Sequence, residues 1–168
     1  DRSRNPSIGG IKRYEEVNYE YITSRTIDVW RPRDYSDDQK YDVLYMEEDY
    51  ILFDSSGTCN NQECEVDEAE AKLMKEGKVR PFIVVGIWNA GKKRYPEYFP
   101  EKVYRELSLL DRTIIKTRLA FQSKSFAPIG DFFYGDNYVR FLANEVVPFI
   151  EKNFNVHSEP AHRFVGGS

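Results

Sequence analysis

The 168-residue sequence has little of the residue types that build disulfide scaffolds and metal centres. It contains two cysteines and two histidines, and Cys59 and Cys64 lie five positions apart in a polar segment. This spacing allows one short disulfide but matches neither a disulfide framework nor a metal-ligand motif. We therefore expect free thiols and no cysteine-based metal site.

Long apolar runs and an excess of one charge are also missing. The longest apolar run covers residues 82–88 and contains Gly86, well short of the roughly 20 residues that span a bilayer. The 24 Lys and Arg are offset by 28 Asp and Glu, for a formal net charge of −4, so no basic surface for nucleic acid is indicated. A glycine-rich phosphate loop and a His-Glu-x-x-His motif are absent too. We therefore expect that the protein binds neither a membrane nor a nucleic acid, and that it holds no metal ion and no cofactor.

Aromatic and apolar residues, by contrast, are plentiful. Aromatics make up 15% of the sequence and apolar residues 40%, which is typical of a folded globular domain and not of a disordered segment. The sequence begins at Asp1 without a secretion signal or lipidation motif, so we expect a mature or trimmed polypeptide. Its compartment, whether secreted, periplasmic or cytoplasmic, stays open.

Periodicity predicts strands in the first half of the chain. Residues 14–22 and 26–31 alternate with a period of two, which predicts an antiparallel hairpin turning at residues 23–25. Residues 41–46 predict a short, more buried strand. Residues 81–87 form a continuous apolar run of the kind that is buried on both faces of a parallel sheet.

Helical spacing appears in three segments. Residues 66–76 have helix-forming composition and end at Gly77, which suits a left-handed helix stop. Residues 101–121 carry apolar positions at helical spacing. Residues 137–154 predict an amphipathic helix that is kinked at Pro148.

A long excursion, residues 88–136, leaves from the end of the predicted parallel strand, and a last buried strand is predicted at residues 162–166. Open α/β sheets place ligand-contacting loops at such strand ends, so we interpret the excursion as lid-like. Its aromatic side chains could stack on a sugar or aryl group or could anchor the excursion; they are Phe126, Phe132, Phe133 and Tyr134. The order of elements predicts an α/β sheet, mostly parallel, with an antiparallel N-terminal edge.

Several segments together resemble a family of α/β-hydrolase esterases that includes enterochelin-esterase-like, S-formylglutathione-hydrolase-like and feruloyl or acetyl-xylan esterase domains. The segments are residues 27–32 (IDVWRP), 41–46 (YDVLYM) with 52–54 (LFD), 83–91 (IVVGIWNAG), 136–154 (DNYVRFLANEVVPFIEKNF) and 162–168 (HRFVGGS). The resemblance implies that residues 1–168 are the N-terminal portion of one α/β-hydrolase domain up to its nucleophile elbow. The C-terminal portion is then absent from this chain.

In that family the last strand runs into the elbow motif G-x-S-x-G, which lifts a serine above the sheet. If Met-Gly-Gly were to follow Ser168, then Gly166, Gly167 and Ser168 would be the first three residues of the motif and Ser168 would be the nucleophile. If the sequence were to continue Ser-Met-Gly-Gly, as is common in these esterases, the nucleophile would instead be the residue that follows Ser168. Taken alone, Gly166 and Gly167 would predict only a turn after a strand.

The resemblance also implies a catalytic acid and a histidine base that follow the nucleophile in the chain. His157 and His162 precede it, so we expect them to make surface or strand-end hydrogen bonds instead. The triad is therefore incomplete in this sequence.

Half of the oxyanion hole is expected after the strand at residues 41–46, at Glu47, Glu48 and Asp49. Three carboxylates there would disfavour a developing oxyanion unless they point to solvent. Trp88 and Asn89 follow the strand at residues 81–87. In the substrate pocket, Trp88 could line an acyl or aromatic subsite and Asn89 could position a loop, or both could pack beneath the excursion.

The resemblance predicts a serine carboxylesterase that hydrolyses an ester of a carbohydrate or another small polar molecule through an acyl-enzyme. A catalytically weakened ligand-binding or interaction protein and an acyltransferase remain as alternatives on the same fold. The expected partners are the ester substrate and the remainder of the hydrolase domain. The sequence leaves open whether the protein forms a homo-oligomer.

Overall fold

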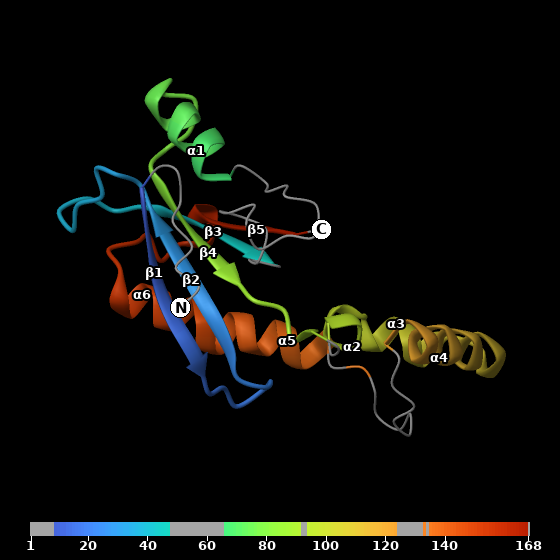
Figure 1. Cartoon of the computed structure of the whole chain (residues 1–168). Helices are drawn as coiled ribbons and strands as arrows, with labels where there is room; N and C mark the ends of the chain where they lie inside the picture. The colour runs from blue at the N-terminus through green and yellow to red at the C-terminus, as the bar shows by residue number, and fades with distance from the viewer. Residues whose placement is uncertain (1–8, 48–65, 92–93, 124–132, 134, 168) are drawn as a thin grey trace. The chain divides into compact units, whose positions relative to one another are not determined.

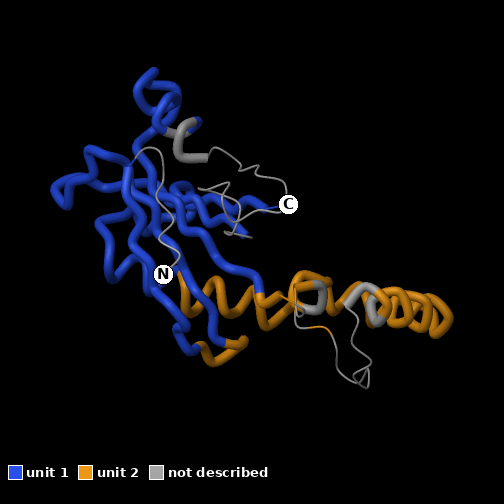
Figure 2. The backbone as a smooth tube through the Cα atoms, in the orientation of Figure 1, with its two compact units in different colours: residues 1–18, 24–89, 147–168 blue, residues 19–23, 90–146 orange. Residues whose placement is uncertain are grey.

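The computed structural model describes residues 9–47, 66–91, 94–123, 133 and 135–167. The chain divides into two compact units, coloured separately in Figure 2. Unit 1 comprises residues 1–18, 24–89 and 147–168, and unit 2 comprises residues 19–23 and 90–146.

Unit 1 is built on a sheet of five strands in the described residues, in the order β1-β2-β4-β3-β5 (Figure 1). The strands are β1 (Gly10–Val17), β2 (Arg25–Arg31), β3 (Asp42–Glu47), β4 (Phe82–Ile87) and β5 (Arg163–Gly166). β2 is antiparallel to both β1 and β4, whereas β3 is parallel to β4 and β5. Only β2 therefore runs against the others, which confirms the predicted α/β sheet with an antiparallel N-terminal edge.

The neighbouring strands β2 and β4 contribute much of the core of unit 1. β4 is buried from Ile83 to its end, as its continuous apolar sequence predicts. On one face, Trp30 and Val84 are fully buried and pack against Met74 of α1 (Val66–Lys75). On the opposite face, the ring of Tyr14 meets that of Phe149 in α6 (Val147–Asn153) at 4.8 Å, edge to face. One helix thus packs on each face of the sheet.

The first strand differs from its prediction. It covers Gly10–Val17 instead of residues 14–22, and Arg25 already belongs to β2. The pairing with β2 shifts register between Tyr14 and Val17, where Glu16 has a positive φ of 45°. Beyond that irregularity, the residues from Tyr19 to Thr23 fall in unit 2. The predicted turn at residues 23–25 is therefore wrong, because the strand ends earlier.

The last strand was expected to be buried, and this is a second correction. Phe164 is 47% exposed and Val165 is 63% exposed. β5 lies at the end of the sheet order and pairs with β3 alone among the described residues. An edge position leaves its side chains with fewer neighbours than a central strand has.

Unit 2 is mostly helical in its described residues, apart from residues 19–23 and the short connections. Its helices are α2 (Arg94–Tyr98), α3 (Glu101–Glu106), α4 (Leu109–Ser123) and α5 (Gly135–Phe141), followed by a π-helical turn, Leu142–Val146. The single helix predicted over residues 101–121 is interrupted. Leu107 is extended, with φ −73° and ψ 151°, and the Ser108 hydroxyl accepts the Asp111 N–H at 3.1 Å. Ser108 therefore caps a new helix.

Pro148 lies in the first turn of α6, directly after the π-helical turn. Proline lacks an N–H and fits the first turn of a helix, so the irregularity expected near Pro148 takes the form of a wider turn before it. None of the helices in the described residues is both long and apolar enough to cross a membrane.

Of the four aromatic residues predicted to stack on a ligand or to anchor the excursion, the structure describes Phe133, which is buried inside unit 2. Its ring centroid lies 4.5 Å from that of Phe99 and 4.4 Å from that of Tyr104. These contacts favour the anchoring interpretation for Phe133. The other three aromatic residues of the predicted cluster, Phe126, Phe132 and Tyr134, lie outside the described residues.

Candidate functional site

The carboxyl ends of three parallel strands meet at one edge of the sheet. In the ladder, Met46 pairs with Gly86 on one side and with Gly166 on the other, and Glu47 pairs with Ile87. Open α/β sheets bind ligands outside the carboxyl ends of their strands. The candidate site is therefore the edge where β3, β4 and β5 end.

Two glycines allow the end of β5 to approach the end of β3 closely. A Cβ at Gly166 would lie 2.7 Å from Met46 Sδ, closer than side chains normally approach. A Cβ at Gly167 would lie 3.3 Å from Glu47 Cβ. Residues without a side chain fit here because the neighbouring strand occupies the space. Ser168 follows in the sequence and lies outside the described residues.

Of the three residues predicted for the oxyanion hole, the structure describes Glu47 only. Glu47 is the half-buried last residue of β3, and its Oε2 lies 3.7 Å from the position of a Cβ on Gly167. A carboxylate therefore lies close to the residue that precedes Ser168, which is the electrostatic feature that the sequence predicts as unfavourable for an oxyanion. Glu48 and Asp49 lie outside the described residues.

An ion pair between a partly exposed arginine and a fully buried carboxylate lies close to the carboxyl end of β4, and no prediction from the sequence covered it. Asp28 is completely buried, and its two carboxylate oxygens accept hydrogen bonds from Nε and Nη2 of Arg13, each at 2.7 Å. The indole N–H of Trp88 donates to Asp28 Oδ2 at 3.2 Å, and the Arg13 guanidinium lies 5.1 Å from the Trp88 ring centroid. Because Asp28 is 15 positions from Arg13 and 60 from Trp88, no local motif marks the group.

Both the side chain and the backbone of Trp88 are therefore hydrogen-bonded within unit 1. Its indole is bound to Asp28, and its backbone N–H donates to the Thr26 carbonyl at 3.1 Å. These contacts place the indole against β1 and β2, and Trp88 and the half-buried Asn89 follow directly after β4. A pocket role for these two residues stays a prediction.

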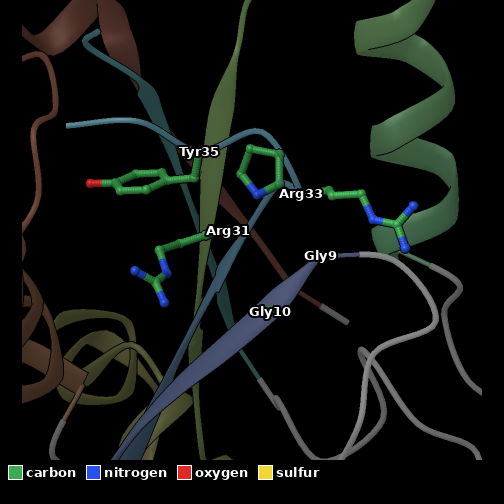
Figure 3. Close-up of a pocket in the computed structure, with 6 residues that line it drawn as sticks. Gly9, Gly10, Arg31, Arg33 and Tyr35 are labelled. Carbon is green, nitrogen blue, oxygen red and sulfur yellow. The ribbon is translucent and has the colours of Figure 1, made fainter. Parts of the chain in front are cut away.

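Two cavities of unit 1 lie near the other ends of the strands. One, of about 480 Å³, includes Asp42 and Phe82, the first residues of β3 and β4. The other, of about 310 Å³, includes Arg31, the last residue of the reversed strand β2 (Figure 3). Figure 3 shows the side chains of Arg31 and Arg33 extending in different directions, so they do not converge on one anion. Neither cavity is at the edge of the sheet where β3, β4 and β5 end.

No protein-family model matches the sequence. Among solved structures, a ferulic acid esterase from Anaeromyces mucronatus, in complex with ferulic acid, is 16% identical with a TM-score of 0.56; the match covers 99% of this chain and 51% of that one. The BES protein from Bacillus cereus is 16% identical with a TM-score of 0.57 and coverages of 98% and 53%. The enterobactin hydrolase IroE, in complex with DFP, is 16% identical with a TM-score of 0.53 and coverages of 97% and 55%.

These similarities establish the fold. The chain has the α/β-hydrolase fold, as the sequence resemblance predicts, and it spans about half the length of these three structures. At this level of identity the likeness extends to the fold alone, and one fold can carry many chemistries.

Proposed function

We propose that the protein hydrolyses carboxylic esters by the serine mechanism of α/β-hydrolases. One observation carries the proposal: β5 runs parallel to β3 and ends in Gly166, with Gly167 packed against Glu47, directly before Ser168 in the sequence. In α/β-hydrolases the nucleophile follows a strand of the parallel sheet at such a glycine-containing turn. The similarity in fold to a ferulic acid esterase and an enterobactin hydrolase supports the same reaction class.

In the proposed reaction, the hydroxyl of Ser168 or of the residue adjacent to it attacks the ester carbonyl carbon. The bond to the alcohol oxygen breaks, the alcohol leaves with a proton, and water then hydrolyses the acyl-enzyme. Backbone N–H groups at Glu47, Glu48 and Asp49, with the N–H after the nucleophile, would stabilise the oxyanion. The base and its orienting acid would follow the nucleophile in the chain, so His157 and His162 have no part in the step.

The proposed substrate class is an ester of a carbohydrate or of another small polar molecule. The named activities of the structural neighbours, on ferulic acid esters and on enterobactin, fit this class. A feruloyl ester and a simple chromogenic ester such as p-nitrophenyl acetate are therefore suitable probes.

The test is labelling of the purified full-length protein, with the base and acid that the proposal requires after the nucleophile, by a fluorophosphonate. It is followed by intact mass and peptide mapping, in parallel with hydrolysis of both esters. We expect one adduct, at Ser168 or the residue adjacent to it, and loss of hydrolysis in the labelled protein. A Ser24→Ala variant, which changes an exposed serine in the connection between β1 and β2, is the control and is expected to label like the wild type.

Three outcomes would contradict the proposal. Absence of both the adduct and hydrolysis would exclude an activated serine. Binding of the ester without turnover would favour a weakened, ligand-binding member of the fold. Turnover only in the presence of an acceptor alcohol would favour an acyltransferase.

A further inference from the structure

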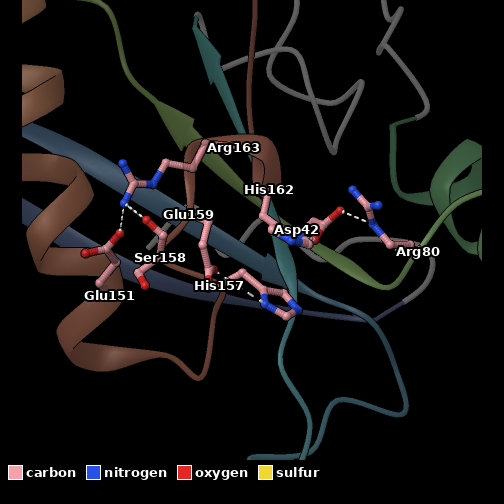
Figure 4. A network of polar contacts seen from close by, with 8 residues as sticks. All are labelled: Asp42, Arg80, Glu151, His157, Ser158, Glu159, His162 and Arg163. Carbon is pink, nitrogen blue, oxygen red and sulfur yellow. Dashed lines mark hydrogen bonds and ion pairs between the residues drawn. The ribbon is translucent and has the colours of Figure 1, made fainter.

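Three side chains from distant parts of the sequence meet at the amino end of β3, away from the candidate esterase site (Figure 4). Asp42 is the first residue of β3, and His162 lies directly before β5. His162 Nδ1 lies 2.6 Å from Asp42 Oδ1, and the rings of His157 and His162 stack with centroids 4.0 Å apart. One potential ligand atom from each residue lies within 4.8 Å of the other two.

The backbone holds these three residues in place. The N–H of His157 donates to the Tyr41 carbonyl at 3.0 Å, the N–H of Asp42 to the Pro81 carbonyl at 2.9 Å, and the N–H of His162 to the Glu159 carbonyl at 3.0 Å. Each residue is therefore fixed by a main-chain hydrogen bond before its side chain binds anything. Such preorganisation lowers the entropic cost of binding.

Within the cluster, the carboxylate of Asp42 is buried, whereas the two imidazole rings are partly exposed to solvent. The side chain of Asp42 is 7% exposed, whereas those of His162 and His157 are 24% and 31% exposed. Arg80 Nε donates to Asp42 Oδ2 at 2.8 Å, so it binds the oxygen that does not contact His162. An ion could reach the imidazoles from solvent without displacing Arg80.

We propose that Asp42, His157 and His162 bind a divalent transition-metal ion of the Zn²⁺ type. Two imidazole nitrogens and one carboxylate oxygen suit Zn²⁺, Co²⁺ or Ni²⁺, whereas Mg²⁺ and Ca²⁺ prefer oxygen ligands only. The ion would replace the proton between His162 Nδ1 and Asp42 Oδ1. Water would complete the coordination on the open side.

Binding requires two small movements of side chains. Zinc bonds to nitrogen and oxygen are about 2.0 to 2.2 Å long and roughly tetrahedral, so the two atoms now 2.6 Å apart must separate by about 0.7 to 1.0 Å. The two rings are stacked, with planes only 19° apart, so their nitrogen lone pairs lie in nearly parallel planes and the His157 ring must rotate for both to point at one ion. Partly exposed imidazoles can make these adjustments without disturbing the core.

The site would join the starts of two parallel strands, because Asp42 begins β3 and His162 directly precedes β5. An ion that binds only the folded protein raises its thermal stability in proportion to the logarithm of the free ion concentration. This consequence does not depend on ester hydrolysis, so the metal site and the proposed function can fail independently.

The test uses the purified protein without a histidine tag, titrated with Zn²⁺ by calorimetry and with Co²⁺ by absorption spectroscopy. We expect one ion per chain, a rise in the midpoint of thermal unfolding, and at least about tenfold weaker binding in each of His157→Ala and His162→Ala. Glu76→Gln, which changes an exposed carboxylate paired with Lys78, is the matched control and is expected to bind like the wild type.

Cys59 and Cys64 could bind Zn²⁺ through thiolates, and the experiment separates this source. The Co²⁺ spectrum is expected to lack thiolate charge-transfer absorption, and a Cys59→Ser/Cys64→Ser variant is expected to retain binding. The proposal is overturned if the wild type binds no ion stoichiometrically, if both histidine variants bind normally, or if the cysteine variant loses binding. Should the histidine variants not fold, Zn²⁺ protection of His157 and His162 from diethyl pyrocarbonate in the wild type decides, and no protection would overturn it.

Discussion

Asp28 shows how one buried charge organises the interior beside the candidate site. Its carboxylate is fully removed from water and would be strongly unfavourable alone, but Arg13 neutralises it with two hydrogen bonds and Trp88 donates a third. The alternation of β2 directs Asp28 to the same face as Trp30, where an apolar residue would be expected. An acidic residue in that position is the sequence signal that could have revealed the pair.

The substitution Asp28→Asn tests this account. The asparagine side chain would keep the shape of the aspartate but would leave the Arg13 charge without its partner, so we expect a loss of about 3 kcal/mol in the free energy of unfolding. Urea unfolding followed by tryptophan fluorescence gives the value. The control Glu76→Gln, at an exposed ion pair, should change it by less than about 0.5 kcal/mol. A loss for Asp28→Asn as small as that of the control would contradict the proposed role.

Tyr45 provides a pH-dependent prediction. The residue is 2% exposed, and its hydroxyl has no hydrogen-bond partner among the described residues. Burial, reinforced by the Glu151 charge and opposed by Arg163, raises the pKa of Tyr45 above its usual 10. The unfolded chain therefore loses this proton first, and the stability that Tyr45 contributes falls as the pH rises above about 10, by up to about 1.4 kcal/mol per pH unit.

The variant Tyr45→Phe removes the titrating group together with the unpaired hydroxyl. We expect a stability near or above that of the wild type at neutral pH, and a shallower decline between about pH 10 and 11. Urea midpoints measured at several pH values give both curves. Parallel curves for the two proteins would show that Tyr45 does not titrate differently on folding.

At the scale of elements, the attachment of β5 depends on a contact with α6. The Arg163 guanidinium donates to the Glu151 carboxylate of α6 and to the Ser158 carbonyl (Figure 4). β5 has hydrogen bonds from a strand on one side only among the described residues, since it pairs with β3 at the sheet edge. The side chain of Arg163 therefore supplies a second connection for the strand that leads to Ser168.

A double-mutant cycle on Arg163→Ala and Glu151→Ala measures that connection. We expect a coupling free energy of about 0.5 to 1 kcal/mol, because both side chains are only partly exposed and their geometry is fixed. The exposed pair Lys78 and Glu76 offers a reference cycle with a smaller coupling. Strictly additive effects of the two β5–α6 substitutions would mean that the pair does not hold the strand.

At the scale of the whole molecule, the two units differ in how fully they bury their apolar residues. In unit 1, β2 and β4 are almost completely buried. In unit 2, several large apolar side chains of α3 and α4 are exposed; they are Val103, Leu109, Leu110, Ile114 and Phe121. Segments with few buried apolar contacts open more readily than the core.

Native-state hydrogen exchange tests that difference. We expect the slowest amides in β2 and β4, with protection close to that of global unfolding, and much faster exchange in α3 and α4. Exchange followed by mass spectrometry of peptides resolves these segments. Equal protection in α4 and β4 would show that the exposed helices are as stable as the central strands.

The sequence predicted features that depend on neighbouring residues better than features that depend on residues far apart in the chain. The strand at residues 81–87 and the helix that ends before Gly77 were predicted nearly to the residue, since apolar runs and helix-stop signals are local. The break at Ser108 was missed although its capping pattern with Asp111 is also local. The predicted extent of the first strand failed because its end depends on pairing with β2 and not on its own composition.

The sequence by itself determined the fold class, the order of strands and helices along the chain, and the position of the glycines before Ser168. Only the tertiary structure decided that β5 is a partly exposed edge strand among the described residues, that Arg13 neutralises Asp28, and that Asp42 lies beside two histidines. The physical reason is distance along the chain. Asp42 and His162 are 120 positions apart, and only the parallel pairing of β3 with β5 brings them within hydrogen-bonding distance.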